Sequence, residues 1–292
     1  LKVGAVKMRV NNRTKNTRKL QEILYKFFAY LSMFIATAVL VGIVLFICIK
    51  GVPHLKPSLF ALNYTSKNVS MFPAIISTIA VVVLAILIAG PIGIFTGIYL
   101  AEYNKGDSKF VKVIRIVTET LSAIPSIVYG LFGYLFFGIA LKMGWSIISG
   151  TLTVSIMILP LIVRSTEEAF LSTPGVYRLG SFALGAGRLR TIFRVILPVA
   201  MPGILSGVIL AIGRVIGETA ALLYTLGTST NLPKSLKDPG ITLSLHMYKL
   251  STEARYTNEA YATAVVLLII IFSLNALSTY LANKIGGNND DR

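Results

Sequence analysis

Six long apolar runs divide the chain, and charged residues gather in the segments between them. The runs extend over residues 27–49, 75–100, 120–141, 143–163, 202–226 and 260–283. A helix needs about 20 apolar residues to cross the hydrocarbon layer of a membrane, where only helices and closed barrels satisfy their backbone groups. Barrel strands would alternate in polarity over about ten residues, whereas these runs are continuous. The pattern therefore predicts an all-α integral membrane protein with six transmembrane helices.

The same pattern predicts the order of segments. Residues 1–26 form a basic tail, 27–49 the first transmembrane helix, 75–283 a core of five further transmembrane helices and 284–292 a second tail. The first run exceeds the about 7–15 residues of a signal-peptide core, so we expect it to stay in the mature protein. Within the core, residues 164–201 are too long for a turn and too regular for a disordered linker, which predicts a docking element.

Composition and charge fit a membrane protein. Hydrophobic residues make up 54% of the chain and charged residues only 14%, yet the formal net charge is +16. With the N-terminus inside, the tails and inner segments hold 19 Lys and Arg residues against 8 in the outer segments. The positive-inside rule therefore places both termini in the cytoplasm. Because the basic residues lie between apolar runs, we expect them to face anionic lipid and expect no nucleic-acid binding.

The chain offers little material for catalysis or metal binding. Its one cysteine, Cys48, lies inside an apolar run, and its two histidines, His54 and His246, lie far apart in predicted loops. We therefore predict neither a metal site nor a catalytic centre. The chain also lacks the glycine-rich loop with lysine that cradles nucleotide phosphates. We expect no cofactor in this chain, and any use of ATP would need another subunit.

Two charged residues, Arg214 and Glu218, interrupt the fifth apolar run. Each charge at the centre of a membrane helix costs about 2.5–3.5 kcal/mol, so both should face a cavity or each other. Their spacing of four residues predicts that they share one helix face and pair. One interpretation is a structural ion pair. The other is an anion station, by which we mean a weak anion-binding site in a transport pathway. A guanidinium matches phosphate oxygens bidentately, while the nearby carboxylate keeps the anion from binding too tightly.

The docking segment is predicted to contain two short helices. Ser172 or Thr173 should cap a helix from Pro174 to Leu184, and Gly185 should supply a left-handed joint. A second helix should follow and end before Pro198, with its apolar residues on one face. These residues are Leu189, Ile192, Phe193 and Ile196. An amphipathic segment lying on the membrane surface is the alternative.

This segment resembles the coupling loop of ABC importer permeases. The family motif reads Glu-Ala-Ala, three residues, Gly, and then about nine residues to Ile-x-Leu-Pro. In this chain Gly185 and Ile196-Leu-Pro match, whereas Leu179, Gly180 and Ser181 stand in place of Glu-Ala-Ala. The resemblance implies that the loop contacts a partner ATPase. The residues to which it assigns this contact are Arg178, Leu179, Gly180, Ser181, Gly185 and Ala186.

Other motifs resemble the phosphate-specific branch of these permeases, and its PstA type more than its PstC type. They begin at Ala123 (Ala-Ile-Pro-Ser-Ile-Val-Tyr-Gly), at Leu159 (Leu-Pro-Leu-Ile-Val-Arg-Ser-Thr-Glu-Glu) and at Ala211 (Ala-Ile-Gly-Arg-Val-Ile-Gly-Glu-Thr-Ala). The resemblance covers roughly residues 75–283. It implies the fold of a type I ABC importer permease, with several passes through the plasma (inner) membrane of a bacterium or archaeon.

The family also implies partners and a substrate pathway. A PstC-like second permease would complete the pathway, a PstB-like cytoplasmic ATPase dimer would bind ATP and magnesium, and a PstS-like external protein would deliver inorganic phosphate. The expected pathway residues are Arg214, Glu218, Arg164, Ser126 and Thr219. Pro125 and Ser126 should break the third transmembrane helix and leave a carbonyl and a hydroxyl free at depth. Arg164 has a plainer alternative, an arginine that snorkels to the membrane edge.

Rival functions remain at this stage. Molybdate or sulfate could replace phosphate, although the Glu218 carboxylate favours an oxyanion that still carries a hydrogen, which phosphate does and sulfate does not. A regulatory or scaffold membrane protein and a channel are further alternatives. A scaffold would not need charges at mid-depth, and a channel would not need a docking loop for an ATPase.

Overall fold

The computed structural model describes residues 2–103, 109–253 and 255–286, and within these ranges every regular element is helical. The chain divides into two compact units, residues 1–50 and residues 51–292. Among the residues described, five helices are long and apolar enough to cross a membrane, and a bent pair makes a sixth span if it is counted as one. The predicted all-α membrane architecture is therefore confirmed.

The first unit is a single helix. Helix α1 spans Lys2–Gly51, so the basic segment and the first apolar run form one continuous helix. A 34-residue candidate span begins within it at Gln21 and ends at His54. The boundary predicted near residue 27 thus marks a change in polarity and not a break in the helix.

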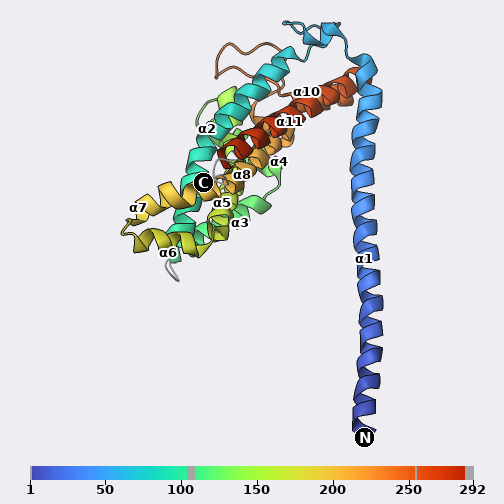
Figure 1. Cartoon of the computed structure of the whole chain (residues 1–292). Coiled ribbons are helices and arrows are strands. Elements are labelled where there is room, and N and C mark those ends of the chain that lie inside the picture. Colours follow the sequence, from blue (N-terminus) through green and yellow to red (C-terminus); the bar gives the residue numbers. More distant parts are fainter. Residues whose placement is uncertain (1, 104–108, 254, 287–292) are drawn as a thin grey trace. The chain divides into compact units, whose positions relative to one another are not determined.

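The second unit is a bundle whose long helices pack against one another (Figure 1). These helices are α2 (Phe72–Glu102), α5 (Ile147–Ser172), α8 (Leu197–Gly217) and α11 (Thr257–Gly286). Its main core joins buried apolar side chains of α2, α5 and α8, including Val81, Ile158 and Ala211. Helix α5 continues to Ser172, so residues 164–172 belong to a helix and not to the predicted docking loop.

Helices α2 and α5 approach closely at glycine positions. A Cβ atom at Gly97 would lie 2.6 Å from Cβ of Thr166 and 2.7 Å from the backbone oxygen of Val163. At Gly93 a Cβ atom would lie 2.7 Å from Cγ2 of Ile162. Small residues let membrane helices pack backbone to backbone, so α2 and α5 form a tightly fitted pair.

The third apolar run is bent. Helix α3 (Lys109–Ala123) meets α4 (Ser126–Gly133) and the π-helical η3 (Tyr134–Ala140) at 101°. Pro125 is extended, with φ −60° and ψ 142°, so the predicted break at this proline is confirmed. Helix α3 begins well before the predicted start at residue 120. Its first turns are amphipathic rather than apolar, and a search for apolar runs therefore misses them.

The docking segment forms α6 (Gly175–Ala183) and α7 (Arg188–Thr191), and we call residues 174–191 the knob. Gly185 has φ +78°, as expected for a left-handed joint. The predicted cap is wrong, because Pro174 occupies the N-cap position and the Thr173 hydroxyl bonds to the backbone oxygen of Ala169.

The predicted end of the second short helix before Pro198 is also wrong. A π-helical turn, η4 (Ile192–Ile196), connects α7 directly to α8. Together they make a 30-residue candidate span, Arg188–Gly217. A wider π turn gives the proline ring room near the preceding carbonyls, which allows the helix to continue.

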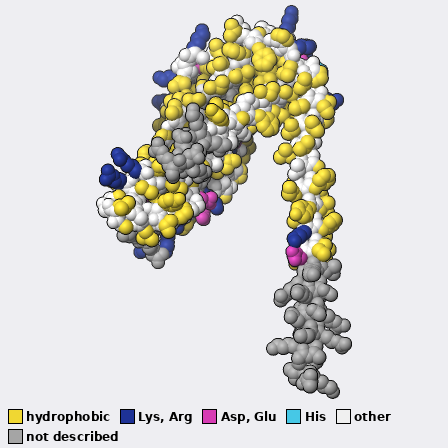
Figure 2. Space-filling model, viewed as in Figure 1, with side chains coloured by type: hydrophobic (Ala, Val, Ile, Leu, Met, Phe, Trp, Pro, Cys, Tyr) yellow, Lys and Arg dark blue, Asp and Glu magenta, His cyan; other side chains and the backbone are white. Residues whose placement is uncertain are grey.

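The knob lies at one end of the bundle, and short elements cover the other (Figure 1). These are η1 (Val52–His54), η2 (Pro57–Phe60), α9 (Ala220–Thr225) and α10 (Leu243–Thr252). Hydrophobic side chains dominate the visible surface of the second unit, and Lys and Arg stand out mainly toward its two ends (Figure 2). That distribution is typical of a protein that crosses a bilayer. The cytoplasmic placement of the knob and both termini stays a prediction.

A buried histidine in α10 predicts a pH-dependent stability. His246 is 1% exposed, its ring meets Tyr64 edge-on with the centroids 6.1 Å apart, and the backbone of Val69 interacts with the ring. Burial lowers the pKa of His246 to about 4, and the Lys249 charge adds to this shift. The unfolded chain, with a histidine pKa of about 6.5, then binds more protons between these two values. Stability is therefore fully present above pH 6.5 and is lost as the pH falls toward 4.

The expected loss is about 2 kcal/mol between pH 7 and pH 5. Thermal unfolding of the detergent-solubilised protein at the two pH values would measure it. His246→Phe keeps an aromatic ring against Tyr64 and should make the midpoint much less sensitive to acid. The matched change His54→Phe should leave the sensitivity in place, and an unchanged response in the His246 variant would contradict the assignment.

Candidate functional site

A charged cavity of about 560 Å³ lies between α3, α5 and α8. Along α5 its lining runs from Met157 to Leu171, which is roughly 21 Å of helix at 1.5 Å per residue. Three arginines and three glutamates contribute to the lining. They are Arg115, Glu119, Arg164, Glu167, Glu168 and Arg214. The cavity therefore brings together Arg164 and Arg214, two of the residues predicted to form a substrate pathway.

Two of the three arginines are already paired with carboxylates. Arg115 of α3 donates to one oxygen of Glu167, from Nε at 3.0 Å and from Nη2 at 2.5 Å. Arg164 donates from Nε to Glu168 at 2.8 Å, and both of these side chains are about two-thirds exposed. The first pair fastens α3 to α5, whereas the second is an exposed pair on one helix and contributes little to stability.

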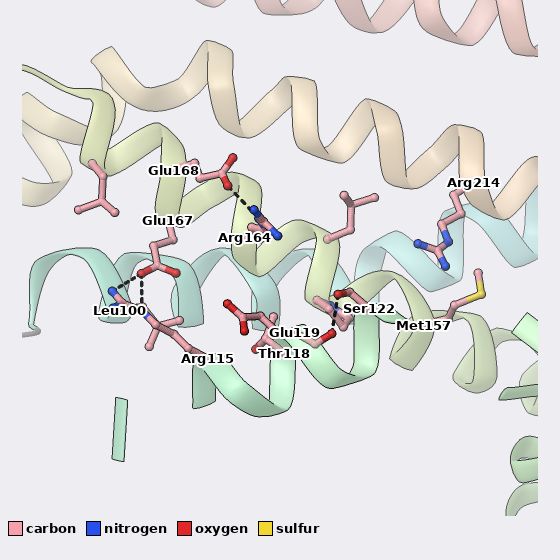
Figure 3. Close-up of a pocket in the computed structure, with 13 residues that line it drawn as sticks. Leu100, Arg115, Thr118, Glu119, Ser122, Met157, Arg164, Glu167, Glu168 and Arg214 are labelled. Atoms are coloured by element: carbon pink, nitrogen blue, oxygen red, sulfur yellow. Dashed lines mark hydrogen bonds and ion pairs between the residues drawn. The ribbon is translucent and has the colours of Figure 1, made fainter. Parts of the chain in front are cut away.

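The guanidinium of Arg214 and the carboxylate of Glu119 form no hydrogen bond or ion pair with a residue that the structure describes, although Ser122 donates to the backbone oxygen of Glu119. Both side chains belong to exposed residues. Figure 3 shows Arg214 at one end of the cavity and the Arg115–Glu167 pair toward the other, with Arg164 and Glu119 between them. The cavity thus offers a ligand one guanidinium and one carboxylate that form no ion pair, although the charge of Glu119 also acts on Arg164.

The predicted pair of Arg214 with Glu218 is absent. Helix α8 ends at Gly217, and Glu218 is extended, with φ −70° and ψ 125°. Its carboxylate instead accepts a hydrogen bond of 3.0 Å from the backbone N–H of Ala221, and Ser244 donates to its backbone oxygen at 2.8 Å. The four-residue spacing places two side chains on one face only while the helix continues. Glu218 is 8% exposed and, from the residue before the N-cap Thr219, its carboxylate satisfies a backbone N–H in the first turn of α9.

The two other predicted pathway residues lie outside this cavity's lining. Ser126 is the first residue of α4, directly after the break at Pro125. Thr219 precedes α9, and its hydroxyl makes only a long contact of 3.4 Å with the backbone oxygen of Gly217. Both are half-buried at the two helix breaks, so their part in a pathway stays a prediction.

The knob carries the residues predicted to contact an ATPase. Leu179, Gly180 and Gly185 are exposed, whereas Ser181 is buried and its hydroxyl lies 2.8 Å from that of Thr191. A shallow hollow of about 340 Å³ lies along α6 and is lined by mainly apolar residues. They include Val176, Tyr177, Gly180, Leu184 and Ala186. An exposed apolar surface with a hollow is typical of a site that receives another protein.

Arg178 has a different role from its neighbours. It points back to the bundle and donates four hydrogen bonds, two to Glu102 and one each to the backbone oxygens of Phe170 and Thr173. Its side chain is only 22% exposed. Arg178 therefore fastens the knob to α2 and α5 and is not available for a partner.

The comparison with protein families decides the class of this protein. Residues 91–287 match the family of binding-protein-dependent transport system inner membrane components. This match covers more than half of the chain. The chain belongs to this family.

Curated relatives resemble the permease over most of its length. It is 33% identical over 276 residues to a probable ABC transporter permease protein, YqgI, of Bacillus subtilis, covering 87% of this chain and 94% of that protein. It is 30% identical over 264 residues to the phosphate transport system permease protein PstA of Haemophilus influenzae, covering 88% and 92%. The chain is thus a multi-pass membrane permease of the PstA type.

Solved structures agree in fold. A chain of a bacterial alginate ABC transporter, in complex with an alginate-bound periplasmic protein, superposes with a TM-score of 0.67 at 13% identity, covering 90% of this permease and 95% of that chain. A chain of the inward-facing methionine transporter MetNI gives a TM-score of 0.62 at 18% identity, covering 73% and 94%. At such identities the likeness concerns the fold alone, which is that of a type I ABC importer permease.

The sequence patterns did not indicate several residues of the permease that line the cavity or hold the knob. Arg115 and Glu119 were placed in a polar connection, although their spacing of four residues fits one face of a helix. Glu167 and Glu168 lie three and four residues after Arg164, and these three charges mask the continuation of α5 in a search for apolar runs. The contact between Glu102 and Arg178 joins positions 76 residues apart, and no local signal indicates it.

Proposed function

We propose that this permease is one transmembrane subunit of an ATP-driven importer for inorganic phosphate. The observation that carries the proposal is the free guanidinium of Arg214 in the cavity, where the other two arginines are already neutralised by Glu167 and Glu168. A guanidinium fork matches two oxygens of a phosphate. One free positive charge attracts an anion without holding it so tightly that it cannot leave.

The choice of phosphate over a fully ionised oxyanion rests on Glu119. Monohydrogen and dihydrogen phosphate carry a hydrogen that a carboxylate accepts, whereas sulfate would meet an uncompensated like charge. Glu218, which the sequence favours for this role, is engaged elsewhere, because its carboxylate accepts a hydrogen bond from the backbone N–H of Ala221 in α9. Glu119 is the acid in the cavity whose carboxylate forms no ion pair. The Haemophilus influenzae relative is named as a permease of a phosphate transport system, which supports the same substrate.

The proposal includes three kinds of partner. A second permease would complete the pathway, and an external phosphate-binding protein would deliver the substrate. Two copies of a cytoplasmic ATPase would bind ATP and magnesium and dock on the knob, because this chain has no phosphate loop of its own. The apolar side chains that the knob exposes support that docking, with Val176 at 69%, Leu179 at 70% and Leu184 at 89% exposure.

The direct test is transport by the assembled complex. The chain would be purified with its partners and reconstituted in vesicles with ATP, and uptake of labelled phosphate would be measured in the presence of loaded binding protein. We expect ATP-dependent uptake that unlabelled phosphate suppresses and that equal sulfate or molybdate leaves nearly unchanged. ATP hydrolysis that responds to loaded binding protein but moves another oxyanion would contradict the phosphate assignment.

One variant in the same assay addresses the substrate choice. Glu119→Gln removes the negative charge and adds a donor, so sulfate no longer meets a like charge in the cavity. We expect roughly a tenfold narrowing of the preference for phosphate over sulfate, the effect of about one charged hydrogen bond. Glu119→Asp keeps a carboxylate and serves as the matched control. An unchanged preference in the glutamine variant would remove Glu119 from substrate selection.

A further inference from the structure

The end of α2 contacts both arms of the knob, which are the helices α6 and α7. Glu102, the last residue of α2, accepts two hydrogen bonds from Arg178 of α6, at 2.9 Å from Nε and 2.5 Å from Nη2. The Glu102 side chain is 9% exposed, so this ion pair is largely shielded from water. Arg178 also donates to the backbone oxygens of Phe170, at 2.8 Å, and Thr173, at 3.0 Å. These carbonyls lie at the end of α5, where helix carbonyls lose their regular partners, and Phe170 O also accepts from the backbone N–H of Thr173 at 3.3 Å.

The next residue, Tyr103, contacts the second arm. The guanidinium carbon of Arg188, the first residue of α7, lies 4.2 Å from the centre of the Tyr103 ring. A cation over an aromatic face at this distance is attracted to it. Tyr103 in turn stacks on Tyr99, one turn earlier in α2, with the rings inclined by 12° and their centres 5.8 Å apart. The ring that receives Arg188 is therefore itself supported.

The two arms are also tied to each other. The backbone N–H of Ala186 donates to the oxygen of Ser181 at 3.1 Å, across the left-handed Gly185. The Ser181 and Thr191 hydroxyls, one from each arm and both buried, lie 2.8 Å apart. The knob is joined to the end of α2 by three contacts, the two hydrogen bonds from Arg178 to Glu102 and the contact of Arg188 with Tyr103, and to the end of α5 by two further hydrogen bonds of Arg178. The knob and the end of α2 are therefore fastened to each other as one rigid body.

This body touches both walls of the charged cavity. On one side Arg178 joins it to α2 and α5, which are fitted together at Gly97 and whose residue Arg164 lines the cavity. On the other side the helix that starts at Arg188 continues through η4 and α8 to Arg214. A displacement of the knob reaches α8 through the continuous helix, and it reaches the wall made by α2 and α5 in step with α8 only while the two arms stay fastened to α2.

We propose that Glu102 and Tyr103 are positioning residues that couple movement of the knob to the cavity, so that their loss separates ATP hydrolysis from transport. The inference rests on the proposed function, because it takes the knob as the place where the ATPase acts. Neither residue touches the substrate. Both act through an arginine of the knob, Arg178 for Glu102 and Arg188 for Tyr103.

The test uses the assembled importer in vesicles and measures phosphate moved per ATP hydrolysed. Glu102→Gln keeps the shape of the side chain but removes its charge, and Tyr103→Leu removes the ring. Each is expected to lower the ratio roughly 2- to 30-fold, the range of effects for residues that carry coupling. ATP hydrolysis and subunit assembly should stay near their normal levels. Tyr103→Phe keeps the ring and should retain coupling, and Glu22→Gln, at an exposed ion pair in α1, is the matched control.

A second measurement does not depend on the substrate. Trypsin cleavage after Arg188 and Arg190 in the same complex should become faster in Glu102→Gln and Tyr103→Leu, because the arms are released. If the normal complex moves no phosphate, the proposed function fails while the cleavage rates still report the contacts. Normal stoichiometry together with normal cleavage in either variant overturns the inference. Loss of assembly in both variants also overturns it, since the contacts would then serve only folding.

Discussion

Replacing Arg214 with methionine is expected to reduce phosphate uptake by about ten- to 100-fold while leaving the subunit folded and assembled. The loss corresponds to charged hydrogen bonds worth about 1.5–3 kcal/mol. Because Arg214 pairs with no described residue, its removal strands no carboxylate in the protein. Arg214→Lys keeps the charge but not the bidentate fork, so uptake should fall about tenfold. Labelled phosphate uptake in vesicles, normalised to assembled complex, is the measurement.

Two comparisons make the Arg214 result specific. Arg164→Lys should have a smaller effect, because that guanidinium is already engaged by Glu168. Arg194→Lys, at an exposed position of η4, should have none. A lysine variant of Arg214 with normal uptake would contradict the anion station. Loss of the subunit from the membrane in Arg214→Met would instead indicate a structural charge with an unrecognised partner.

The second large effect is expected at Gly97, where α2 and α5 touch. Gly97→Ala would bring a methyl group within 2.6 Å of Cβ of Thr166 and 2.7 Å of a backbone oxygen, neither of which is the end of a flexible chain. We expect a destabilisation of about 1–3 kcal/mol. Gly97→Leu should prevent the two helices from packing and abolish the assembled subunit. The yield and the thermal unfolding midpoint of detergent-solubilised protein would measure both.

Gly213→Ala is the matched control for Gly97. No atom lies within 4 Å of a Cβ built there, so the change should be neutral or should stabilise α8 by up to about 1 kcal/mol through helix propensity. Thr166→Gly combined with Gly97→Ala should recover part of the loss, because the clash with Val163 oxygen remains. Equal behaviour of the two alanine variants would show that α2 and α5 do not fit as tightly as described.

The fold was predictable wherever apolar runs were long enough to decide it. The spans around α2, α5, α8 and α11, the break at Pro125 and the left-handed Gly185 all follow from local rules. The ends of helices were less predictable. Helix α5 extends past Val163 because charges there are satisfied by α3, as the contact of Arg115 with Glu167 shows. A sequence gives no measure of a charge that is neutralised by a distant segment.

Only part of the site was predictable, because a sequence does not show which distant segments meet. Arg164 and Arg214 line one cavity, as residues of a shared pathway should, although no observation tests their role. The pairing of Arg214 with Glu218 failed because Gly217 ends α8, and a glycine followed by a residue that can cap is a recognisable signal for a break. Glu119 lines the cavity because α3 packs beside α5, and this contact between distant segments cannot be read from the sequence.

The π turn of η4 gives the length of this segment an unusual importance. A π turn holds one residue more than an α-helical turn, and each residue of an α-helix rotates the chain by about 100°. Over Ile192–Ile196 the π turn therefore completes about the same rotation that an ordinary helix completes with one residue fewer. If all five residues instead formed an ordinary helix, the knob would be turned by about one residue's rotation around the axis of α8, away from Tyr103 and Glu102. The direction in which the knob points thus depends on the π turn, so deleting one residue within this turn should be tolerated better than deleting one residue elsewhere between Arg188 and Arg214.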